Sequence, residues 1–185
     1  MKFNDHHQFD GMHAFLSASK WHWLNYTPEH LAEVYTSSMA AQLGTELHAI
    51  ASDLIKHHIR LPRSKKTLNQ FVNDAIGYRM ESEQVLFYSV NCFGTTDAIS
   101  FDGKLLRVHD LKTGTIPAHM EQLEIYTGLF CLEYDVNPED IRMELRIYQN
   151  DEVVVYEPEP KRIREVMGKI ISSDKRIEQL KEESR

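Results

Sequence analysis

Two aspartates and a lysine lie close together in the middle of the chain, at Asp97, Asp110 and Lys112. Neighbouring carboxylates repel one another unless a cation lies between them, and such oxygen ligands suit Mg²⁺ or Mn²⁺. A divalent ion can polarise a phosphoryl oxygen and activate bound water, while a lysine can orient that water. This trio is therefore predicted to hydrolyse phosphodiester bonds. The spacing D-x-K leaves one alternative open, a salt bridge between Asp110 and Lys112 on a solvated sheet face.

A β-hairpin is expected to bring the trio together. Apolar and β-branched residues predict strands over residues 95–101 and 104–111. Between them, Asp102-Gly103 suits the two-residue type I′ turn, which needs positive φ angles. This turn would pair Phe101 with Lys104.

The expected register determines which side chains share a face of the sheet. It places Asp97 opposite Val108, and side chains alternate along each strand. Asp97, Asp110 and Lys112 would then project from one face and His109 from the other. A loop one residue longer would shift the register by one and separate the two aspartates.

Helices are expected around this hairpin. The segment Thr27-Pro28-Glu29 resembles a helix start with proline in the first turn. Apolar residues at helical spacing predict helices over 38–58, 67–80, 117–134 and 161–185. Further strands are predicted over 85–90, 141–148 and 153–156.

Size and charge limit the classes of protein that the chain could belong to. Its 185 residues suffice for one substantial core, so a single domain is expected. A formal net charge of −7 argues against polyanion binding by the whole surface. The run from His57 to Lys66 is a local basic exception, which could equally be a solvated helix end and loop.

Cysteine content and hydropathy give further expectations. Cys92 and Cys131 lie in apolar stretches and are expected to be buried thiols, and two cysteines cannot form a four-cysteine cluster. No run of about eighteen apolar residues occurs, and residues 1–12 lack the features of a signal peptide. No membrane association and a cytoplasmic location are expected.

Four short motifs, in order, resemble those of RecB-like nucleases of the PD-(D/E)XK superfamily. Gly44-Thr45-Glu46-Leu47-His48 resembles the G-x-x-x-H motif of the first core helix. Residues 94–99, 108–114 and 122–126 resemble the three motifs that follow it. Ser17-Ala18-Ser19 is loosely similar to an entry segment of phage and Cas4-like members.

The resemblance implies a role for each matching residue. It makes His48, Asp97 and Asp110 metal ligands, with the backbone carbonyl of Leu111 as an additional ligand, and it makes Lys112 the catalytic lysine. Without the other motifs, His48 would be read as a histidine packed beside an apolar helix stripe.

Gln122 and Tyr126 match the Q-x-x-x-Y signature of the same branch. Their i, i+4 spacing places both on one helix face, where they are expected to bind the DNA backbone or to support the site.

The resemblance also implies a fold, a restriction-endonuclease-like α/β (α+β) core in which helices flank a mixed central β-sheet. A single nuclease domain, 1–185, would comprise a motif core of about 38–150, a helical segment 1–37 and a C-terminal helix of about 159–183.

The implied activity is that of a Mg²⁺- or Mn²⁺-dependent deoxyribonuclease without an iron–sulfur cluster. An exonuclease or processing nuclease of recombination, repair or phage DNA metabolism is expected. A structure-specific endonuclease is one alternative; a catalytically silent DNA- or protein-binding module that docks through the C-terminal helix is another. No G-x-x-x-x-G-K-[ST] loop is present, so any ATP-driven translocation would come from a helicase or recombination partner.

Overall fold

The structure is a computed structural model that describes Gln8 and residues 14–184. Contacts divide it into two compact units, residues up to Leu43 and residues from Gly44 onward. The first unit contains the 3-10 helix η2 (Ala18–Asn25) and the beginning of helix α1 (Pro28–Lys56), which continues unbroken into the second unit. The predicted helix start is confirmed, and the Thr27 hydroxyl accepts the amide of His30 at 3.2 Å.

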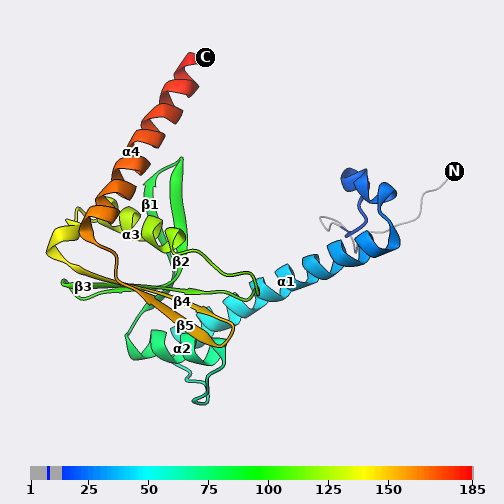
Figure 1. Cartoon of the computed structure of the whole chain (residues 1–185), viewed down its shortest axis with the longest axis horizontal. Coiled ribbons are helices and arrows are strands. Elements are labelled where there is room, and N and C mark those ends of the chain that lie inside the picture. The colour runs from blue at the N-terminus through cyan, green and yellow to red at the C-terminus, as the bar shows by residue number, and fades with distance from the viewer. Residues whose placement is uncertain (1–7, 9–13, 185) are drawn as a thin grey trace. The chain divides into compact units, whose positions relative to one another are not determined.

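The second unit is built on a five-stranded mixed sheet (Figure 1). Its strands are β1 (Glu81–Ser89), β2 (Cys92–Phe101), β3 (Leu105–Leu111), β4 (Arg142–Gln149) and β5 (Glu152–Tyr156), adjacent in chain order. Among the strand pairs within residues 14–184, only β3 and β4 are parallel, because helix α3 (Glu121–Glu133) carries the chain from the end of one to the start of the other.

Helices cover both faces of this sheet, so the predicted α/β class with a mixed sheet flanked by helices is confirmed. One core packs α3 and helix α4 (Pro160–Glu183) against the sheet. The other packs helix α2 (Thr67–Gly77) and the second half of α1 against the opposite face. None of the helices in residues 14–184 is both long enough and apolar enough to span a membrane.

The predicted turn between β2 and β3 is wrong. Phe101 pairs with Leu106 and not with Lys104, so four residues separate the paired positions. The Asp102 carboxylate accepts the amides of Lys104 at 2.9 Å and Leu105 at 2.8 Å, which holds a wider loop open. A two-residue turn with two positive φ angles occurs instead between β4 and β5, at 150–151.

Candidate active site

Asp97 on β2 and Asp110 on β3 lie on the same face of the sheet. Ala98 pairs with His109, and continuing this register by one residue sets Asp97 opposite Asp110. The predicted partner of Asp97, Val108, pairs with Ile99 instead. The wider loop shifts the register by two residues, an even number, and therefore leaves the predicted faces unchanged.

The Asp97 carboxylate joins two other predicted site residues. Its Oδ1 lies 3.2 Å from Nδ1 of His48, which reaches it from α1. Its Oδ2 accepts the backbone amide of Leu111 at 2.7 Å. The hydrogen bond to Asp97 raises the pKa of His48 above its ordinary value, and the negative charge of Asp110 acts in the same direction.

Asp110 is the buried carboxylate of the site, with only 2% of its surface exposed. Burial, and then the negative charge of Asp97, raise the pKa of Asp110 to about 6. Lys112 Nζ donates to Oδ1 at 3.2 Å and forms an ion pair with Oδ2 at 3.0 Å. The lysine ammonium therefore faces both oxygens of this buried carboxylate.

A chain of hydrogen bonds runs from Lys112 to helix α3. Lys112 Nζ donates to Gln122 Oε1 at 2.8 Å, and Gln122 Nε2 donates to the Tyr126 hydroxyl at 3.0 Å. The i, i+4 spacing of Gln122 and Tyr126 allows this contact within one helix. The structure thus brings both residues to the trio, where they position the lysine.

Two glycines make room for the site. A Cβ atom at Gly94 on β2 would lie 2.8 Å from Cε1 of Tyr126. One at Gly44 on α1 would lie 2.7 Å from Oγ1 of Thr113. Real Cβ atoms do not approach other atoms so closely, so these positions exclude larger residues unless the neighbour moves.

Glu83 is a neighbour of the site that the sequence did not predict. On β1, the pairs of the flanking residues with Ala98 and Thr96 set Glu83 across from Asp97. Its φ is 55°, a conformation that non-glycine residues seldom adopt and that is frequent at functional sites. Its negative charge also favours the protonated form of His48. No sequence signal marks a glutamate in this conformation.

His109 lies on the opposite face, as predicted, and is fully buried. Tyr148 donates its hydroxyl proton to Asp74 at 2.8 Å, so the His109 Nδ1–H is the donor in the 3.2 Å contact with the Tyr148 oxygen. Nε2 of His109 then has no partner. Burial, followed by the charges of Arg146 and Arg107, lowers the pKa of His109 to about 3.

The carboxylate pair fits a divalent cation. Asp97 and Asp110 lie opposite one another, and the Lys112 ammonium, 3.0 Å from Oδ2 of Asp110, offsets one of their two negative charges. A divalent cation would offset the remainder. Within residues 14–184, no three His, Cys, Asp or Glu side chains converge into a complete metal shell. Mg²⁺ does not need one, since it commonly takes one or two carboxylates and keeps several waters. Ligation by His48 and by the Leu111 carbonyl stays a prediction.

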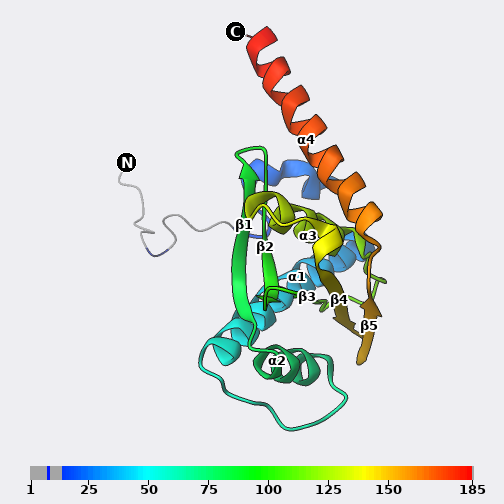
Figure 2. The same ribbon diagram turned by 90° about the vertical axis from the view of Figure 1, so that its left-hand side faces the viewer.

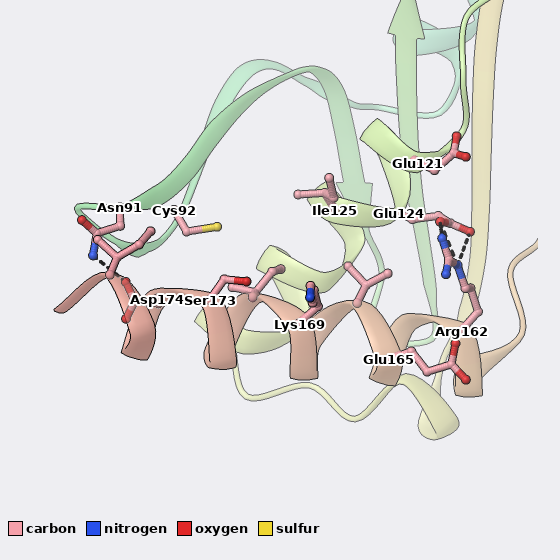
Figure 3. A pocket seen from close by; sticks show the side chains of 13 residues that line it. Asn91, Cys92, Glu121, Glu124, Ile125, Arg162, Glu165, Lys169, Ser173 and Asp174 are labelled. Carbon is pink, nitrogen blue, oxygen red and sulfur yellow. Dashed lines mark hydrogen bonds and ion pairs between the residues drawn. The ribbon is translucent and has the colours of Figure 1, made fainter. Parts of the chain in front are cut away.

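Helix α3 is also fixed from its other side. A hollow of about 520 Å³ lies between α3, α4 and the β1–β2 turn, and none of the predicted site residues lines it. Figure 3 shows the side chains around it. Beside it, Glu124 of α3 is buried and accepts hydrogen bonds from Arg162 of α4 on both oxygens, at 3.1 Å on Oε1 and at 3.0 and 2.6 Å on Oε2. This ion pair holds α3, and with it Gln122 and Tyr126, against α4.

No protein-family model matches the chain, and no curated protein matches it. Among solved structures, the crystal structure of SSO0001 is similar at a TM-score of 0.39 with 14% sequence identity, covering 82% of this chain and 68% of that chain. A TM-score below 0.5 does not establish a shared fold.

Proposed function

We propose that the chain is a Mg²⁺- or Mn²⁺-dependent nuclease that hydrolyses phosphodiester bonds of DNA. The observation that carries the proposal is the buried Asp110, set opposite a second carboxylate, Asp97, and paired with Lys112. A surface salt bridge would not need a buried carboxylate or a second carboxylate beside it.

The proposed roles follow from the contacts. Asp97 and Asp110 would hold the metal together with His48 and the Leu111 carbonyl. The ion, when bound, supplies Lewis-acid polarisation of the phosphate and of a water molecule. Lys112 stabilises the negative charge that develops on the phosphate oxygens.

Gln122 and Tyr126 set the position of the lysine amine. The Gln122 carbonyl oxygen draws Nζ of Lys112 toward α3, and the Tyr126 hydroxyl fixes the orientation of the Gln122 amide. An exonuclease or processing nuclease of recombination, repair or phage DNA metabolism is the form of this activity that we propose. A cytoplasmic location and a helicase or recombination partner belong to the same proposal.

The test is cleavage of labelled single-stranded, linear duplex and closed circular DNA, with Mg²⁺, Mn²⁺ or EDTA. Lys112→Ala and Asp110→Ala should each lower the rate at least about a hundredfold. Lys104→Ala, an exposed lysine of the β2–β3 loop, is the matched control and should cleave at the wild-type rate. Cleavage that persists in EDTA or in both site variants would rule the mechanism out. Degradation of linear but not closed circular DNA identifies an exonuclease.

A further inference from the structure

The loop that joins α1 to α2 concentrates positive charge. Between Asp53 and Asp74 the sequence has five lysines and arginines and no carboxylate, in a chain of formal net charge −7. We call residues 56–66 the basic loop; Figure 2 shows it as a long arc running past α2. Local charge opposite to that of the whole chain favours a polyanionic ligand at this place.

The charges of the basic loop are exposed and largely unneutralised. Arg63, Lys65 and Lys66 are exposed, and in the described part of the chain none has a carboxylate within 4.0 Å. Many surface cations elsewhere are paired, as Arg164 is with Glu139.

Two carboxylates beside the basic loop, Asp74 and Asp151, have other partners. Asp74, beside the loop, accepts Arg146 at 3.3 Å and the Tyr148 hydroxyl at 2.8 Å. Asp151, near Lys66, accepts the amide and the hydroxyl of Thr67 at 2.8 and 3.1 Å. In the described part of the chain, neither carboxylate forms an ion pair with Arg63, Lys65 or Lys66 within 4.0 Å, so these side chains can contact a ligand.

Helix α2 holds the backbone of the basic loop in place. Asn73 donates to the carbonyl of Leu61 at 2.9 Å and accepts its amide at 3.0 Å. Asn69 donates to the carbonyl of Pro62 at 2.8 Å, and Gln70 donates to that of Lys65 at 2.6 Å. Three amide side chains on one helix thus fix the backbone of the loop, so little backbone ordering is needed when a ligand binds.

The end of the basic loop adjoins the candidate active site. Thr67, which follows Lys66, lines a cavity of about 230 Å³ together with Lys112 and Thr113. Leu47, one residue before His48, lines the same cavity. A DNA strand with its scissile phosphate at Lys112 could therefore run past this cavity and then along the basic loop.

We propose that the basic loop binds the phosphate backbone of the DNA strand that flanks the cleaved bond. The inference rests on the proposed nuclease function and adds the path of the substrate. Arg63, Lys65 and Lys66 act as phosphate contacts that position the strand without reading its sequence. Binding through them releases counterions, so it must weaken steeply with salt.

The test measures binding apart from cleavage. Fluorescence anisotropy in EDTA follows a labelled oligonucleotide across a series of KCl concentrations, with the full chain and with Arg63→Gln/Lys65→Gln/Lys66→Gln. If each residue contacts one phosphate, the slope of log Kd against log salt should fall by about 2 for a single strand. In cleavage assays KM should rise while kcat stays unchanged, because uniform binding is lost.

Lys104→Gln/Lys161→Gln/Lys175→Gln is the matched control, since it removes the same charge from exposed lysines elsewhere. This control variant should keep the wild-type slope. If the triple loop variant does not fold, Arg63→Gln alone should lower the slope by about a third of the decrease expected for the triple variant. Equal slopes in the loop variant and the wild type, or equal losses in loop and control variants, would overturn this inference and leave the proposed function standing. A wild-type protein that neither binds nor cleaves DNA would overturn both.

Discussion

The ring of Tyr126 occupies the space that a side chain on Gly94 would need, since a Cβ atom there would lie 2.8 Å from Cε1. Gly94→Ala should therefore push the ring away and release Gln122 and Lys112 from their hydrogen bonds. We expect kcat on DNA to fall on the order of tenfold or more, and overpacking to lower the free energy of unfolding by about 1–3 kcal/mol.

Gly114→Ala is the control for Gly94→Ala, because nothing lies within 4 Å of a Cβ atom there. Adding Tyr126→Ala to Gly94→Ala should recover stability but not activity. Equal urea midpoints for Gly94→Ala and the control would show that the close approach does not constrain the protein.

Asp110→Asn should stabilise the protein in EDTA at neutral pH. It removes a buried charge beside Asp97 while keeping the shape of the side chain, so we expect a gain of about 1–3 kcal/mol. Saturating Mn²⁺ should raise the Tm of the wild type and leave that of Asp110→Asn unchanged. Equal shifts in both proteins, measured by thermal unfolding, would argue against a metal at Asp110.

His109 should make the fold sensitive to acid. Its folded-state pKa, about 3, is below the ordinary value of 6.5, so the unfolded chain takes up the proton first as the pH falls. The contribution of neutral His109 to the free energy of unfolding is fully present above pH 6.5 and is lost progressively toward pH 3. At pH 4 the free energy of unfolding should have fallen by about 3 kcal/mol. His109→Asn, whose amide can replace the Nδ1–H donor to Tyr148, should flatten urea unfolding between these pH values.

His119→Gln is the matched control for His109→Asn, because the His119 side chain is 85% exposed. It should leave the pH profile unchanged. A profile as steep in His109→Asn as in the wild type would assign the acid sensitivity to other groups.

Arg162→Met should loosen α3 from α4. Glu124 has 6% of its side chain exposed and would lose its charged partner, at an expected cost of about 1–3 kcal/mol. Arg164→Met is the control, since it breaks a pair with both side chains 50% exposed, and should cost less than about 1 kcal/mol. Urea unfolding measures both costs. If adding Glu124→Gln to Arg162→Met restores the free energy of unfolding, the unpaired buried carboxylate of Glu124 is the cause of the loss.

The sheet face from which Asp97, Asp110 and Lys112 project could be predicted from the sequence, although the turn between β2 and β3 could not. Alternation along a strand depends only on whether the register error is odd or even, and the error at Phe101 was two residues. The loop length itself depends on the Asp102 carboxylate accepting two amides, one of several turns that Asp-Gly permits.

Other parts of the site depend on contacts distant in sequence. His48 and Asp97 are 49 residues apart, and only the motif order suggested that they meet. The positive φ of Glu83 and the approach of Tyr126 to Gly94 result from tertiary packing, which periodicity and propensity do not describe.

The amide of Lys112 donates to the carbonyl of Tyr148, on the strand parallel to β3, at 2.9 Å. Every residue predicted to perform the chemistry precedes residue 127, yet this anchor is synthesised afterwards, beyond α3. A parallel pair cannot form until its crossover is complete. During synthesis, therefore, the growing chain contains all the predicted site residues before β4 is available to fix the backbone of Lys112. The site should become catalytically competent only after β4 has paired with β3.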